Sequence, residues 1–199
     1  MITVVLFKIR ISVSVGFFGV IAFLSYIDNT GMALYALLAA VTHEAGHIIF
    51  IYILKYRINE VVLTFTKAEI KGNFNFNKSD EVVIALAGSA FNFIVFIILT
   101  MLNYFFKFET FKLSSAMFAV GIFNLLPVIG LDGGTVLRCA FLGNVREKLA
   151  NITCMAVSMI FCIIIFTLGF IAFKYNLNPS LLIMSLYLFM LTLKCRELS

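Results

Sequence analysis

Two histidines and one glutamate in the stretch AAVTHEAGHIIF, residues 39–50, are the side chains whose types and spacing could do chemistry. His43 and His47 are the only two histidines of the chain. They stand at i and i+4, so on a helix both imidazoles project from one face and can bind one ion. Glu44 is rotated by about 100° from His43, which keeps its carboxylate beside the ion without making it an equivalent ligand. This H-E-x-x-H pattern is typical of a catalytic zinc site.

A catalytic zinc ion has three protein ligands and an open fourth position, so one further ligand is expected. Asp132 lies in the stretch NLLPVIGLDGG, residues 124–134, where Pro127 and Gly130 interrupt an apolar helix. Broken backbone at membrane depth is tolerated only where it is buried in protein or lines a water-filled cavity. Asp132 is therefore the candidate third ligand. A glutamate in this role is disfavoured, because the other glutamates lie in loops or at the chain end: Glu60, Glu69, Glu81, Glu109, Glu147 and Glu197.

The composition is that of an integral membrane protein. Hydrophobic residues make up 62% of the 199 residues and charged residues only 13%, against about 25% in soluble domains. The net charge of +5 is not concentrated in a basic patch, so nucleic acid is not an expected partner. The cysteines are predicted to be small core residues, without a disulfide framework or a cysteine metal site: Cys139, Cys154, Cys162 and Cys195.

Six apolar stretches are long enough to span a bilayer, which takes about 20 residues. The first follows Lys8 and Arg10 as a signal peptide would, but it lacks an A-x-A-like cleavage site and is expected to be an uncleaved transmembrane helix. The fourth is interrupted. The expected spans are residues 10–27, 31–54, 82–106, 113–142, 149–173 and 178–194.

Lysine and arginine gather in one set of loops, which places both termini in the cytoplasm. The polar interval 57–81 contains EVVLTF and AEIKGNFNF, which are rich in β-branched and aromatic residues and favour a hairpin, with an amphipathic loop as the alternative. The expected fold class is an all-α polytopic membrane protein. It has six transmembrane helices, a broken fourth helix and a small cytoplasmic-side β-hairpin, in one membrane-embedded domain over residues 1–199.

The motifs HEAGH and NLLPVIGLDGG, two spans apart, resemble those of the site-2 protease family of intramembrane zinc metalloproteases. The spacing and six-span layout are most similar to its stage IV sporulation protein FB branch. The resemblance implies that His43, His47 and Asp132 bind one Zn²⁺ ion and that Glu44 is the catalytic acid/base. It also implies that Asn124 helps to position the substrate.

The stretch AGSAFN, residues 87–92, is similar to the family's A-G-P-x-x-N segment, with Ser89 in place of the proline. The resemblance carries over Gly88 and Asn92 as packing or substrate-facing residues, while Asn92 could equally join helices by a hydrogen bond. Gly130 stands where the sporulation branch tends to have proline. The chain ends at Ser199, so neither a CBS domain nor a PDZ domain is expected.

The resemblance implies hydrolysis of a peptide bond in or near a membrane-associated segment of a regulatory protein. A pro-sigma factor, an anti-sigma factor or a remnant signal peptide would be such a substrate. The expected location is a bacterial cell membrane, with further membrane proteins as regulatory partners, and a role in sporulation is one expected setting. A metal transporter is an alternative, although its polar residues would be spread along several spans rather than gathered at one depth. A non-catalytic membrane scaffold is a second alternative. The presence of all the expected ligand and base residues argues against it.

Overall fold

The computed structural model describes residues 2–6, 9–14, 28, 31–63, 68–72, 74–142, 147–175 and 180–197. The chain divides into two compact units, Met1–Ile122 and Phe123–Ser199. The first unit contains a sheet and helices, and the second contains helices among its described residues. That the whole chain acts as a single metalloprotease domain stays a prediction.

The sheet of the first unit has four strands in the order β1-β2-β3-β4: β1 (Ile2–Leu6), β2 (Ile9–Val13), β3 (Ile58–Leu63) and β4 (Ala68–Gly72). Strands β1 and β2 pair antiparallel, β2 and β3 parallel, and β3 and β4 antiparallel. The pairing of β3 with β4 agrees with the hairpin expected in the polar interval. A buried serine ties β2 to β3, because Ser12 Oγ donates a hydrogen bond to Glu60 Oε1 at 2.9 Å.

The strand β2 corrects the first expected span, residues 10–27. Its sequence, IRISV, alternates apolar and polar residues and is rich in β-branched side chains, which favours a strand over a helix. The rest of that span, residues 15–27, lies outside the described residues. The expected all-α class with only a hairpin is therefore wrong in this respect, although the chain is mostly helical.

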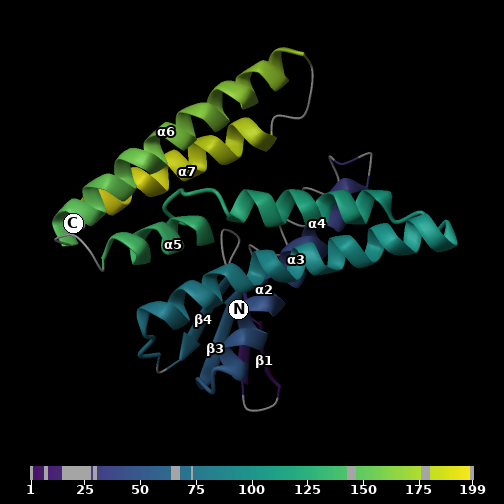
Figure 1. Ribbon diagram of the computed structural model, residues 1–199, viewed down its shortest axis with the longest axis horizontal. Coiled ribbons are helices and arrows are strands. Elements are labelled where there is room, and N and C mark those ends of the chain that lie inside the picture. The colour runs from purple at the N-terminus through teal and green to yellow at the C-terminus, as the bar shows by residue number, and fades with distance from the viewer. Residues whose placement is uncertain are drawn as a thin grey trace. The chain divides into compact units, whose positions relative to one another are not determined.

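Among its described residues, the first unit has three helices beside the sheet: α2 (Met32–Ile53), α3 (Lys78–Phe106) and α4 (Phe111–Asn124), which ends just inside the second unit. At the start of α2, Gly31 takes a positive φ of 73°, and the carboxylate of Asp28 accepts a hydrogen bond from the backbone N–H of Ala33. The helices share a buried cluster in which Ala39 of α2 packs with Ala116 and Met117 of α4. Helices α3 and α4 lie side by side (Figure 1).

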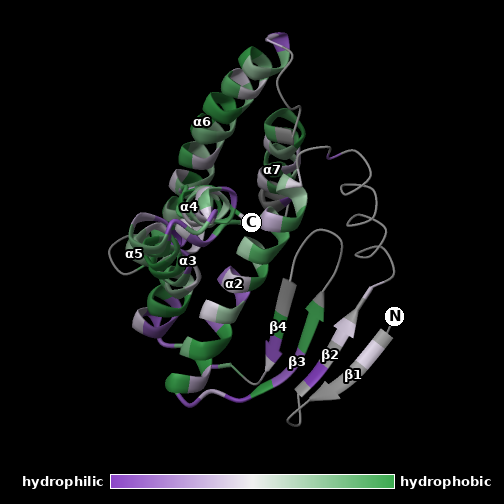
Figure 2. Cartoon of the chain, turned by 90° about the vertical axis from the view of Figure 1, so that its right-hand side faces the viewer, coloured by the Kyte–Doolittle hydropathy of each residue, from purple (hydrophilic) through white to green (hydrophobic). Residues whose placement is uncertain are grey.

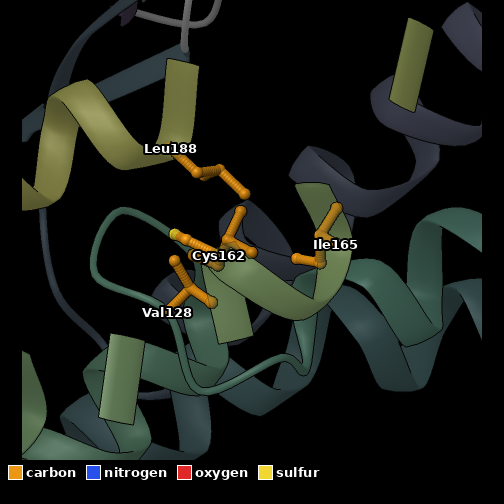
Figure 3. Packing of buried hydrophobic residues seen from close by; sticks show 5 residues of the cluster. Val128, Cys162, Ile165 and Leu188 are labelled. Atoms are coloured by element: carbon orange, nitrogen blue, oxygen red, sulfur yellow. The ribbon is translucent and has the colours of Figure 1, made fainter. Parts of the chain in front are cut away.

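The second unit is formed by α5 (Asp132–Phe141), α6 (Glu147–Lys174) and α7 (Ser180–Glu197). Helices α6 and α7 run alongside each other (Figure 1). Figure 3 shows their core, where Val128 of the segment before α5 packs against Cys162 and Ile165 of α6 and Leu188 of α7. The predicted burial of the cysteines is confirmed for Cys139, Cys154 and Cys162.

Three of the described helices, α2, α3 and α6, are long and apolar enough to cross a membrane. Apolar residues run along most of α6 (Figure 2). Large apolar side chains are also exposed on these helices, including Ile97 and Met101 of α3 and Ile163 and Phe170 of α6. Such surfaces suit contact with lipid. The count of six spans stays a prediction, as does the joining of α4 and α5 into one broken span.

Candidate metal centre

Helix α2 places both histidines on its buried face, with exposed fractions of 4% for His43 and 9% for His47. Their Nε2 atoms lie 3.1 Å apart, and the two rings meet edge to face with centroids 4.8 Å apart. The i, i+4 spacing of the sequence thus brings the two imidazoles together as expected.

A backbone carbonyl fixes the tautomer of His47. Nδ1 of His47 lies 2.8 Å from the carbonyl oxygen of Ile84 in α3. Because a carbonyl only accepts hydrogen bonds, Nδ1 carries the proton and the neutral ring keeps its Nε2 lone pair, which faces Nε2 of His43. A hydrogen bond from the second ring nitrogen to a carbonyl is the usual support of a metal-binding histidine.

Two glycines let α2 and α3 approach each other closely at this point. A Cβ atom added to Gly88 of α3 would lie 2.6 Å from Nε2 of His47 and 2.7 Å from Cε1 of His43. A Cβ atom added to Gly46 of α2 would lie 2.7 Å from the carbonyl oxygen of Ala87. Gly88 therefore leaves the space that the two imidazoles occupy. This supports the packing role carried over for Gly88.

Glu44 follows His43 on α2 and is half-buried. Its position in the helix turns it by about 100° from the His43 direction. The carboxylate is therefore on the same helix as the two imidazoles but projects from a different face. A group that transfers protons beside a metal ion requires such a position.

Asp132 is the first residue of α5 in the second unit and is half-buried. Helix α4 ends at Asn124, and residues 125–131 between the two helices are not helical. A carboxylate in the first turn of a helix is stabilised by the positive end of the helix dipole. Gly133 and Gly134 follow, and a Cβ atom at either would collide with backbone of this segment, at the carbonyls of Leu125 and Val128. Glycine is thus required for the segment to fold back on α5.

The residues of α2 fit a zinc ion. Two nitrogen ligands at about 2.0–2.1 Å from a tetrahedral zinc lie about 3.3 Å apart, close to the distance between the two Nε2 atoms. The fixed tautomer of His47 supplies the lone pair that a ligand needs. By type, two imidazoles and the carboxylate of Asp132 are ligands that a catalytic zinc ion takes.

The two asparagines of interest differ in their surroundings. Asn124 is half-buried at the end of α4. Asn92 of α3 is fully buried, as is Ser89 one turn before it, and in the described part of the chain neither side chain has a hydrogen-bond partner. Gly121 of α4 packs near Asn92 Cβ. The substrate-positioning roles of Asn92 and Asn124 stay predictions.

Two features of the centre were missed in the sequence. The carbonyl of Ile84 cannot be recognised there, because any residue has one and only the packing of α2 on α3 selects it. Gly46 did carry a signal, since a glycine inside a helix costs about 0.5–1 kcal/mol relative to alanine and usually has a packing reason.

The fold is similar to that of the solved site-2 protease from Methanocaldococcus jannaschii. The TM-score is 0.71 and the sequence identity 21%, over 97% of this chain and 94% of that chain. No protein-family model matches the chain, and no curated protein does. At this identity the likeness shows that the chain has the fold of a site-2 protease.

Proposed function

We propose that the chain is an intramembrane zinc metalloprotease in which His43, His47 and Asp132 bind one Zn²⁺ ion. The observation that carries the proposal is the pair of buried imidazoles on α2, with Nε2 atoms 3.1 Å apart and the tautomer of His47 fixed by Ile84. The site-2 protease fold supports it independently of the motif. The acidic third ligand is supported by its chemistry and by its place at the start of α5.

When bound, the zinc ion would polarise the scissile carbonyl and lower the pKa of a water molecule. Glu44 would accept a proton from the attacking water on a carboxylate oxygen and return it to the nitrogen of the leaving amine. The C–N bond breaks as the water oxygen bonds to the carbonyl carbon, so that the products are a carboxylic acid and an amine. Asn92 and Asn124 would hold the substrate backbone.

The substrate that fits this site is a membrane-associated regulatory protein, such as a pro-sigma factor, an anti-sigma factor or a remnant signal peptide. A peptide bond in a helix is shielded by the helix's own hydrogen bonds, so the segment to be cut must first become extended. Strand β4 lies at one edge of the sheet and could hold such a segment as an added strand. Both termini would be cytoplasmic, and the sporulation protein FB branch remains the proposed affiliation.

The role of the strand edge can be tested with proline, but not in β3, which pairs with strands on both sides. Neighbouring N–H groups of a strand point to opposite edges. Of the two variants Ile70→Pro and Lys71→Pro in β4, one therefore removes an inward donor, which faces β3, and the other an outward donor, which faces the edge of the sheet. The variant that loses the outward donor should cleave more slowly and retain zinc. Wild-type cleavage by both variants would remove strand addition at β4 from the proposal.

The test of the function compares membrane proteomes of cells that make the wild-type chain or Glu44→Gln. One or a few membrane-associated proteins should accumulate as uncleaved precursors in the variant. The matched control is Glu109→Gln, the same change at an exposed site outside the centre, which should leave the proteome as in wild type. Identical proteomes for wild type and Glu44→Gln would contradict the proposal.

A further inference from the structure

A buried serine of α6 contacts the non-helical segment that precedes Asp132. Ser158 is fully buried, and its Oγ accepts a hydrogen bond from the backbone N–H of Ile129 at 2.9 Å. The same hydroxyl donates to the carbonyl of Cys154, one turn back in α6, at 2.7 Å. The Pro127 carbonyl is 3.5 Å away, and the single hydroxyl proton goes with the shorter contact. The hydroxyl therefore links α6 to the segment.

The segment needs this link because its backbone is outside any helix. Non-helical backbone at membrane depth must have its polar groups satisfied. Pro127 has no N–H, and the N–H groups of Val128 and Leu131 bond to carbonyls close by in the chain. The N–H of Ile129 lies between them, and its acceptor is the hydroxyl of Ser158. A side chain of a distant helix thus satisfies a donor that the segment itself does not.

The link lies next to a second attachment and close to the acid. Val128 is fully buried and packs on Cys162, one turn after Ser158 on α6 (Figure 3). A hydrogen bond from Leu131 N–H to the Val128 carbonyl, at 3.0 Å, closes the turn that leads directly into Asp132. A shift of the segment on α6 would therefore move the backbone that carries the carboxylate.

We propose that Ser158 is a positioning residue, which presents the carboxylate of Asp132 by holding the backbone of Ile129 on α6. The expected effect on zinc binding rests on the proposed function, whereas the hydrogen bond between Ser158 and Ile129 does not depend on it. A serine that serves only helix structure would behave differently, and α7 offers one. Ser185 is 1% exposed, and its hydroxyl donates a hydrogen bond to the carbonyl of Leu182, three residues back in its own helix, at 2.7 Å.

The experiment compares Ser158→Ala with Ser185→Ala in the full-length protein in detergent. Two quantities are measured: the hydrogen exchange of the peptide covering residues 125–134, and the zinc affinity. Thermal unfolding curves first identify a temperature at which both variants are folded, and both measurements are made there. Ser158→Ala should speed exchange in this peptide by about tenfold or more, because the N–H of Ile129 loses its acceptor. It should weaken zinc binding by about tenfold, as loss of support behind a metal ligand does. Ser185→Ala should change neither.

Wild-type exchange in Ser158→Ala would overturn the inference. Faster exchange with wild-type zinc affinity would also overturn it, since Ser158 would then hold the segment without positioning a ligand. Equal effects of the two variants would do the same. A wild-type protein that binds no zinc would contradict the proposed function instead, and the exchange comparison would then decide the inference alone.

Discussion

Two regions of the chain supply the proposed zinc ligands, and they are built differently. On α2 an uninterrupted helix carries both histidines, and contact with α3 sets their rings through Ile84 and Gly88. Asp132 instead follows a non-helical segment, residues 125–131, whose backbone is held by glycine contacts and by a serine of another helix. A regular helix needs only the right spacing to bring two ligands together, whereas a ligand on broken backbone depends on several separate contacts.

The largest expected effect concerns the regular helix. If α2 carries the reacting group as well as two ligands, Glu44→Gln should lower the rate of peptide hydrolysis by about 10²–10⁴-fold, the usual contribution of general acid–base catalysis. Zinc content should stay as in wild type, because Glu44 is not a ligand. The measurement is cleavage of an accumulated precursor by purified protein, with zinc determined on the same samples. Wild-type cleavage by this variant would show that α2 provides ligands only.

The next effect concerns the non-helical segment before Asp132. Gly133→Ala places a Cβ atom against the Leu125 carbonyl, where only backbone movement can relieve the collision. Overpacking of this kind costs about 1–3 kcal/mol, which a thermal unfolding curve in detergent would register. Gly121→Ala is the matched control, because its Cβ would meet the ring of Phe93, a side chain that can move. Equal stability of the two variants would mean that the segment adapts more easily than its contacts suggest.

A smaller effect is expected where α2 meets α3. Gly88→Ala would put a Cβ atom within 2.6 Å of Nε2 of His47 and force the imidazoles apart. Zinc affinity should fall by about tenfold, the lower end of the range for disturbed support of a ligand, while the helices themselves remain intact. Competition with a coloured zinc chelator measures this, again beside Gly121→Ala. Unchanged affinity in Gly88→Ala would remove α3 from the description of the histidine site.

The smallest effect lies at the ends of the same two helices. Tyr56, just after α2, donates a hydrogen bond to Asp80 in the first turn of α3 at 2.7 Å, and this bond raises the pKa of Tyr56 above its usual 10.0. The protonated phenol is the stabilised form, so the contribution of the bond is present below pH 10 and is lost as the pH rises through the raised pKa. The ultraviolet titration of wild type minus that of Tyr56→Phe should show a midpoint above 10.0. Asp80→Asn should lower that midpoint, and an unchanged one would assign the shift to another cause.

The same difference explains what could be predicted from the sequence. The spacing of His43 and His47 is a helical spacing, so their convergence followed from the sequence and is seen in the structure. Ile129 and Ser158, which are joined by a hydrogen bond, are 29 residues apart in the chain, and no local pattern connects them. The sequence around β2 favours a span because its apolar residues continue into the next apolar stretch. The strands that pair with it are hard to recognise from the sequence, since β1 is short and β3 is distant in the chain.

Whether one zinc ion is bound by both regions can be decided from the zinc content per chain of wild-type protein and of Asp132→Ala after dialysis against a weak chelator. We expect about one zinc ion per wild-type chain, as for a single site of three protein ligands, and much less in the variant. Equal zinc in both proteins would contradict the claim that the two regions share one metal ion.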